Sequence, residues 1–368
     1  YKRVKEPKDQ IEDVAQLFLG VRIGCAQCHH HPFERWSQDD YHGLAAYFSQ
    51  VGRRPTSTRG EDLIFHKRGL AGAVNPKTGA RVAPAALGFP EGPISADEDP
   101  RLRLGQWLVR PDNPFFAKAL VNRYWKHFFG RGLVEPEDDL RDTNPAVNPE
   151  LLEGLASHFR EAKWDLKDLV RTIVLSRTYQ TSAVPLPENA DDQQHFTHFL
   201  PRRLPAEVLL DSLDRLTGAS TTFANLPPGT KAIALPDTSY NRSSPFLQVF
   251  GRPDGQSVCE CERVQSSSLA QSLHLLSAAD IKGKLATEGG RADRLSKSAD
   301  DAAAVREIFL AAFARLPSEA ETIQARAVIA EPRTSAEGQA LPEPQARREN
   351  LEDLLWALAS SKEFLFNH

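Results

Sequence analysis

The segment Cys25-Ala26-Gln27-Cys28-His29 is a complete C-x-x-C-H motif, and it constrains the surrounding fold more than any other feature of the sequence. Two thiols three residues apart can each form a thioether with one vinyl group of a porphyrin, while the adjacent imidazole binds the iron. In a helical turn, residues i and i+3 share one face, so both sulfurs would meet one edge of the macrocycle. The motif predicts one covalent haem c, with Cys25 and Cys28 as tethers and His29 as the proximal ligand.

Two other chemistries fit the same residues. Cys25, Cys28, His29 and His31 could hold a structural zinc, although adjacent ligands seldom both reach one tetrahedral ion. The two thiols could instead form a redox dithiol or a small disulfide loop. The metal-bound alternative describes a non-haem surface scaffold or assembly protein.

The second axial position of the predicted haem has three candidate ligands, His66, His127 and His31. His31 is the least able to bend back to the same iron. The 368 residues include no methionine, so a methionine of this chain is excluded as the ligand. A filled position favours electron transfer with a redox partner protein, and an open one favours small-molecule or peroxide chemistry.

The charge balance excludes some classes of partner. Lys and Arg number 45 against 49 Asp and Glu, so the chain has no strongly basic field of the kind that binds nucleic acid. No run approaches the roughly 18 apolar residues of a transmembrane helix. The sequence begins at Tyr1 rather than methionine, which is compatible with a removed signal sequence, anchor or upstream domain, or with a second chain.

Hydrophobic periodicity predicts a mainly α, multi-helical fold with a small β-hairpin and long ordered loops. Residues 101–182 carry apolar residues at helical spacing, and one helix there is expected to end at Gly130. Asn148 is a ready N-cap for the next helix, with Pro149 at its first position.

The predicted hairpin lies in a loop-rich connector over residues 53–100. Its strands are expected at 62–66 and 80–83, on either side of the turn-like segment 75–79. Residues 219–258 are expected to form a long ordered loop.

Two clusters of polar or reactive residues have several explanations. The acidic segment 135–142 could collect a calcium ion or, through Asp138 and Asp139, support glycoside hydrolysis, although such loops are most often solvated or paired to arginines. Cys259 and Cys261 are too tightly spaced for a second haem motif. They are expected to be a strained disulfide, a reduced pair or two buried small residues.

Four strings carry a resemblance that runs from end to end: FLGVRIGCAQCHHHPFERWSQDDYHGLAAYF, NRYWKHFFGRGLVEPEDDLRDTNPAVNPELLEGLA, FGRPDGQSVCECER and LLWALASSKEFLFNH. The chain resembles the paralogous surface or periplasmic proteins of planctomycetes and verrucomicrobia, in which a cytochrome-C-like domain precedes a planctomycete-specific domain of unknown function. The resemblance implies that residues 1–52 are the C-terminal part of the first domain and residues 101–368 the second.

The resemblance also implies a periplasmic or cell-surface location and a haem-type motif at Cys25, Cys28 and His29. It implies no known reaction. An aromatic residue often stands in that family where this chain has His42. Sequence and resemblance together predict an extracytoplasmic c-type haem protein in electron transfer or haem-based redox chemistry.

Overall fold

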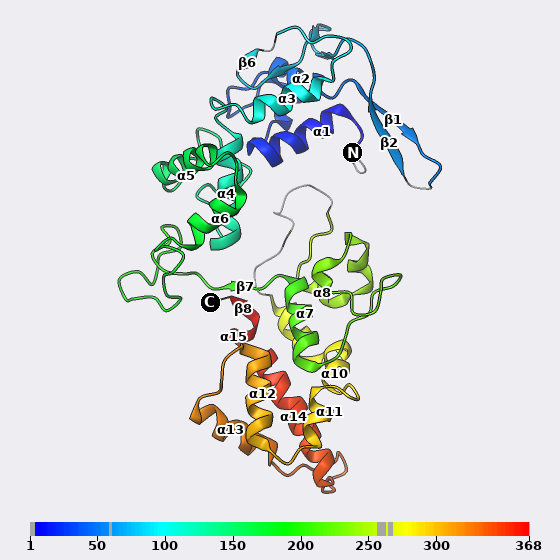
Figure 1. Ribbon diagram of the computed structural model, residues 1–368, viewed down its shortest axis with the longest axis vertical. Helices are drawn as coiled ribbons and strands as arrows, with labels where there is room; N and C mark the ends of the chain where they lie inside the picture. The colour runs from blue at the N-terminus through cyan, green and yellow to red at the C-terminus, as the bar shows by residue number, and fades with distance from the viewer. Residues whose placement is uncertain (1–3, 59–60, 91, 256–262, 264–267, 368) are drawn as a thin grey trace. The chain divides into compact units, whose positions relative to one another are not determined.

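The computed structural model describes residues 4–58, 61–90, 92–255, 263 and 268–367, and its fold is mainly α-helical, as the sequence predicts (Figure 1). The chain divides after Leu200 into two compact units. Each unit has its own buried apolar residues. The boundaries expected after residues 52 and 100 both fall inside the first unit.

The first unit is built from short helices and two-stranded sheets. Its helical elements are α1 (Pro7–Val14), the π-helical turn η1 (Ala15–Leu19), the 3-10 turn η2 (Gly24–Gln27), α2 (Gln38–Ala46), α3 (Pro100–Leu108), α4 (Phe116–Phe129), α5 (Pro149–Glu161) and α6 (Leu166–Val174). Its strands are β1 (Val51–Pro55), β2 (Asp62–His66), β3 (Ala73–Val74), β4 (Arg81–Val82), β5 (Ala85–Ala86) and β6 (Phe89–Pro90).

The expected hairpin pairing is wrong for one of its two strands. A hairpin does surround the turn at 75–79, but there β4 pairs with β3. The strand at 62–66, β2, instead pairs antiparallel with β1 in a hairpin of its own. Nearest strands in the chain pair at the lowest loop-closure cost, and an ion pair of 3.0 Å between Arg53 and Asp62 lies across this pairing.

Helix ends in the first unit follow the local chemistry of the sequence. Gly130 ends α4 with φ of +78°, the left-handed conformation that glycine adopts without steric cost. The Asn148 side chain accepts a hydrogen bond of 2.9 Å from the Leu151 N–H and caps α5, with Pro149 at the first helical position. Both expected boundaries are confirmed.

Two apolar clusters stabilise the first unit. One joins α1, α2 and α3 around the fully buried rings of Tyr41, Tyr47 and Trp107. The other joins α4, α5 and α6 around Trp125 and Phe159. Burial of an aromatic or large aliphatic side chain stabilises a fold by about 1.5 to 3 kcal/mol. These clusters therefore fix the helices that carry the C-x-x-C-H segment and the acidic loop.

The second unit is a helical assembly whose two ends meet. Strand β7 (Arg202–Arg203) pairs antiparallel with β8 (Phe366–Asn367). Its helical elements are α7 (Ala206–Thr217), η3 (Ala232–Ala234), η4 (Thr238–Ser243), α8 (Pro245–Val249), α9 (Leu269–Ser277), α10 (Ala279–Leu285), α11 (Arg291–Ser296), α12 (Asp301–Phe313), α13 (Glu319–Ile329), α14 (Glu343–Ala359) and α15 (Lys362–Leu365). The loop expected at 219–258 thus carries three short helical segments.

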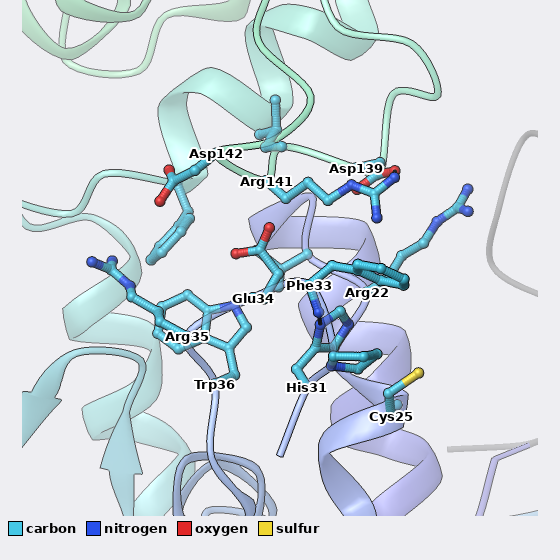
Figure 2. A pocket seen from close by; sticks show the side chains of 15 residues that line it. Arg22, Cys25, His31, Phe33, Glu34, Arg35, Trp36, Asp139, Arg141 and Asp142 are labelled. Carbon is cyan, nitrogen blue, oxygen red and sulfur yellow. Dashed lines mark hydrogen bonds and ion pairs between the residues drawn. The ribbon is translucent and has the colours of Figure 1, made fainter. Parts of the chain in front are cut away.

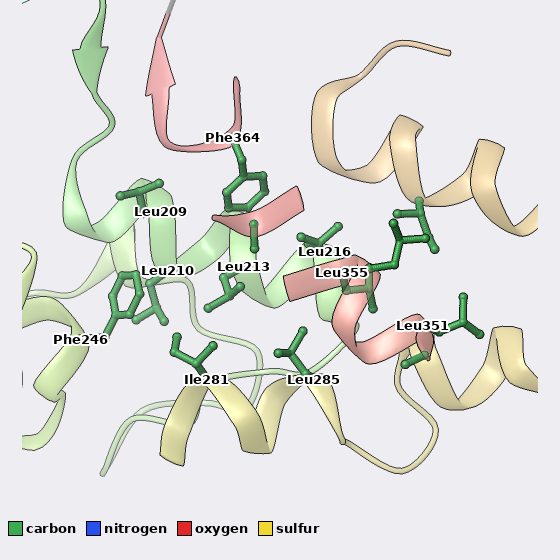
Figure 3. Close-up of a cluster of buried hydrophobic side chains, with 14 of the residues drawn as sticks. Leu209, Leu210, Leu213, Leu216, Phe246, Ile281, Leu285, Leu351, Leu355 and Phe364 are labelled. Carbon is green, nitrogen blue, oxygen red and sulfur yellow. The ribbon is translucent and has the colours of Figure 1, made fainter. Parts of the chain in front are cut away.

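Helix α7 lies at the centre of this unit. Its buried leucines face the apolar sides of α10 and α14, as Figure 3 shows for Leu213, Ile281 and Leu355. These side chains are at most 2% exposed. The amphipathic pattern of α7 therefore organises the core of the second unit.

Within the described ranges, no helix is both long and apolar enough to cross a bilayer, as the sequence predicts.

We expect Leu213→Ala to lower the free energy of unfolding by about 2 to 5 kcal/mol, because it leaves a cavity in a core that cannot fully collapse. Urea titration followed by circular dichroism measures this change. Leu269→Ala is the matched control, since Leu269 is 75% exposed, and it should change stability by less than about 0.5 kcal/mol. Equal effects of the two substitutions would contradict the core described for α7.

Candidate functional site

The C-x-x-C-H segment begins in a 3-10 turn rather than in an α-helix. Residues Gly24–Gln27 form η2, and Cys28 is its C-terminal cap. The Cys28 N–H donates to the Cys25 carbonyl, the i to i+3 bond of this helix type. Side chains three residues apart eclipse each other in a 3-10 turn. The backbone of this turn is thus compatible with the shared face that the sequence predicts for the two thiols.

Both sulfur atoms are available for chemistry. Cys25 and Cys28 are free cysteines with exposed side chains. His29 is also exposed, and its Nδ1 lies 2.6 Å from the carbonyl oxygen of His30. An Nδ1–H donated to a carbonyl fixes the tautomer in which Nε2 is the free metal ligand.

Helix α2 anchors the motif through hydrogen bonds to the backbone of Gln27. A capping box between Ser37 and Asp40 starts this helix. The Gln38 side-chain amide donates a hydrogen bond of 3.3 Å to the Gln27 carbonyl. The buried ring of His42 hydrogen-bonds to Gln27 as well, and burial lowers the pKa of His42 although Asp39 and that hydrogen bond oppose the change.

A pocket of about 350 Å³ adjoins the first cysteine (Figure 2). It is formed by the segment that enters η2, the loop that follows the motif, the start of α4 and the acidic loop. Its lining residues are Val21, Arg22, Gly24, Cys25, His31, Pro32, Phe33, Glu34, Arg35, Trp36, Phe115, Asp139, Leu140, Arg141 and Asp142. Of the three motif residues predicted to bind haem, Cys25 is thus the one that reaches this pocket.

The acidic loop that closes this pocket is buried and paired. Glu137, Asp138 and Asp139 are 1%, 0% and 7% exposed. Lys126 on α4 bonds to Glu137 at 2.5 Å, and Arg141 bonds to Asp139 at 3.1 Å. Of the expected explanations, pairing to basic residues is the one the structure supports.

Asp138 links this loop to the segment that carries the motif. Its Oδ1 accepts a hydrogen bond of 2.6 Å from Arg22 Nη2, and its Oδ2 accepts one from the Gln16 side chain. Burial alone would raise the pKa of Asp138, but the hydrogen bonds from Arg22 and Gln16 outweigh it and hold the pKa below its usual value. Both carboxylate oxygens of Asp138 accept hydrogen bonds, and the residue is fully buried. Asp138 is therefore poorly placed to act in glycoside hydrolysis.

The three candidates for the second axial position lie in different places. His31 lines the pocket beside Cys25, and its Nδ1 accepts a hydrogen bond of 3.3 Å from the Phe33 N–H. His66 lies on β2, where its charge acts on Asp99. His127 is exposed near the end of α4, with its ring against Phe128. The histidine judged least suitable from sequence is the one beside the pocket.

Across the described part of the chain, the structure assembles no group of three or more His, Cys, Asp or Glu side chains that could hold a metal ion. Cys259 and Cys261 lie outside the described residues.

Sequence reasoning missed the basic side of the pocket. The pocket lining includes Arg22, Arg35 and Arg141, which come from separate segments of the chain. The one sequence signal that pointed to them was the density of acidic residues at 135–142, which required basic partners somewhere in the fold.

Family models match two parts of the chain. Residues 100–329 match the PSD1 model, described as a protein of unknown function (DUF1553), and this match spans more than half of the sequence. The chain belongs to the PSD1 family. Residues 1–53 of this PSD1 protein match the PSCyt2 model, described as a protein of unknown function (DUF1549).

Both matches are to planctomycete-type domains of unknown function, which agrees with the second domain that the resemblance implies; the cytochrome-C-like character of the first domain stays a prediction. The PSCyt2 match covers the C-x-x-C-H segment, and the PSD1 match covers the acidic loop and most of the second unit. No curated protein and no solved structure matches the chain.

We expect Asp138→Asn to lower the free energy of unfolding at pH 7 by about 1 to 3 kcal/mol, because it weakens a charge-assisted bond to a half-exposed arginine. The pKa of Asp138 is lowered in the folded state, so its contribution is present above the unfolded pKa near 3.8 and is lost as pH falls through the folded value. Chemical denaturation at pH 7 and at pH 3 measures both effects.

The stability difference between wild type and Asp138→Asn should shrink toward pH 3. Asp142→Asn is the control, since Asp142 is exposed, and it should leave stability within about 0.5 kcal/mol of wild type. A difference that grows on acidification would contradict the lowered pKa.

Proposed function

We propose that this PSD1 protein is an extracytoplasmic c-type haem protein that acts in electron transfer or haem-based redox chemistry. Cys25 and Cys28 would tether one haem c through thioethers, and His29 would bind the iron on the proximal side. Residues 1–52 would be the C-terminal part of a cytochrome-C-like domain. The single observation that supports this most is the pair of exposed, unbridged thiols at the two ends of one 3-10 turn.

The donor set fits a covalent haem. Each thioether requires an accessible thiol, and both cysteines are exposed. The iron requires an imidazole with one nitrogen free, and the Nδ1 of His29 already lies at hydrogen-bonding distance from a backbone carbonyl. Phe33, which is 67% exposed, adds apolar surface on the loop that follows the motif. Bound there, haem would supply reversible one-electron transfer at iron.

The position of the motif favours electron exchange with another protein. Cys25, Cys28 and His29 are all exposed, so a haem attached to them would have an edge open to solvent and to a partner. Ring exposure and the identity of the second ligand set the reduction potential. We take His31 as the second ligand in this proposal because it lines the pocket beside Cys25, whereas His66 and His127 do not.

The periplasmic or cell-surface location belongs to the same proposal. Covalent haem attachment by two thioethers is suited to an extracytoplasmic setting, and so is the family that the sequence resembles. A redox partner protein is the expected partner.

The alternative is a non-haem, zinc-type surface scaffold held by the same cysteines and histidines. Its four candidate ligands are close in sequence, but Cys25, Cys28 and His29 would have to converge with the half-buried His31 from exposed positions. Metal analysis of the purified protein separates the two functions.

We expect the protein, produced in a bacterial periplasm with haem-attachment machinery, to show a Soret band that survives acid-acetone extraction. Its pyridine haemochrome should give one haem per chain, because two thioethers keep the porphyrin on the polypeptide. Cys25→Ser with Cys28→Ser should abolish the covalent haem, and His29→Ala should change the iron spectrum.

His30→Ala is the matched control, since His30 is exposed next to the motif but is not a predicted ligand, and it should retain the haem. A colourless protein with one zinc per chain would overturn the haem proposal and support the scaffold. A colourless protein without metal would leave the thiol chemistry of the two cysteines as the function of the motif.

A further inference from the structure

The pocket beside Cys25 contains charges that the protein itself does not neutralise. Among its arginines, Arg22 is paired with Asp138 and Arg141 with Asp139. Arg35 forms no ion pair within the described part of the chain, and the same is true of Asp142. Both are exposed and both line the pocket. Glu34, a third lining residue, also forms no ion pair among the described residues, so the pocket presents one unpaired guanidinium, from Arg35, and two unpaired carboxyl groups.

Arg35 and Asp142 reach the pocket lining from separate segments of the chain. In Figure 2, Arg35 and Asp142 lie on the same side of the pocket. The Arg35 guanidinium lies 4.7 Å from the centre of the Trp36 ring, so a cation–π contact orients it. Asp142 is the last residue of the acidic loop, and its neighbour Arg141 is fixed by an ion pair with Asp139.

A third group shows the sign of the field around Asp142. Burial raises the pKa of Glu34, and the charge of Asp142 raises it further, while His31 and Arg141 oppose the change. Repulsion between the carboxyl groups of Glu34 and Asp142 is one cause of this shift, and a positive charge placed between them would relieve it. A ligand ammonium placed there would be stabilised by both carboxyl groups.

We propose that this pocket binds a small zwitterion, a free α-amino acid, with its carboxylate on Arg35 and its ammonium facing Asp142. Arg35 supplies a planar fork that suits a carboxylate. The exposed Phe33 on the pocket rim would contact an apolar side chain of the ligand. A volume of about 350 Å³ lies at the small end of ligand sites, which favours one amino acid over a longer peptide.

This binding site goes beyond the haem function and does not require it. Of the predicted haem-binding residues, Cys25 alone lines the pocket. An amino acid bound there would lie next to the proposed haem and would bring a redox-active centre and a small substrate together.

Calorimetric titration of the full chain with L-phenylalanine tests the proposal. We expect saturable binding of one molecule per chain. The single-charge analogues 3-phenylpropionate and 2-phenylethylamine should each bind at least tenfold more weakly, since each can satisfy one of the two charged groups. Arg35→Gln and Asp142→Asn should each weaken L-phenylalanine binding at least tenfold.

Arg171→Gln and Asp191→Asn are matched controls, because both residues are exposed and neither lines the pocket, and they should bind as wild type does. Thermal melts verify that every variant is folded. Absence of saturable binding to L-phenylalanine, L-leucine and glycine in folded protein would overturn the proposal, and so would equal affinity for 3-phenylpropionate.

Repeating the titration with protein produced without haem-attachment machinery separates the two proposals. Amino-acid binding by the colourless protein supports the pocket whatever the outcome for haem. Binding that is lost in folded, haem-free protein would overturn the independent site.

Discussion

The bond between Arg22 and the fully buried Asp138 is the interaction on which the rest of the first unit's site depends. It joins a residue just before the C-x-x-C-H turn to a loop more than a hundred residues later, at 2.6 Å. A buried carboxylate without such a partner is strongly destabilising. Moving the loop away from the motif segment would leave Asp138 without Arg22, so this ion pair holds the two segments together. The pocket exists because this loop and the motif segment are fixed together.

In the C-x-x-C-H motif, the groups that anchor the turn are buried and the groups that can react are exposed. Its supporting groups are internal: the Gln27 carbonyl is bound from α2, and Ala26 is fully buried. Its reactive groups, the two thiols and the imidazole of His29, are exposed. A short turn anchored through its backbone can present side chains outward without losing its conformation. The two thiols and the His29 imidazole are therefore accessible from solvent while the turn itself stays anchored.

Local chemistry in the sequence predicts helix ends better than it predicts pairing. Gly130 and Asn148 set their helix boundaries through backbone conformation and a side-chain hydrogen bond, and these act within a few residues. The sequence predicts the wrong partner for strand β2. The segments before and after β2 both have a compatible strand pattern, and the pairing depends on which connecting loop closes. The sequence also does not predict that Glu137 and its neighbours are buried, because a solvated acidic segment and one paired to basic residues have the same sequence pattern.

By itself, the sequence determined the helical class of the fold, the helix caps and the motif with its three residues, because periodicity, capping and covalent spacing are local properties. The tertiary structure decided which charges meet and which stay unpaired. One pocket is lined by Arg22, Arg35 and Arg141, although Arg22 and Arg141 lie 119 residues apart in the sequence. No spacing rule connects such residues, because their proximity results from the packing of whole helices.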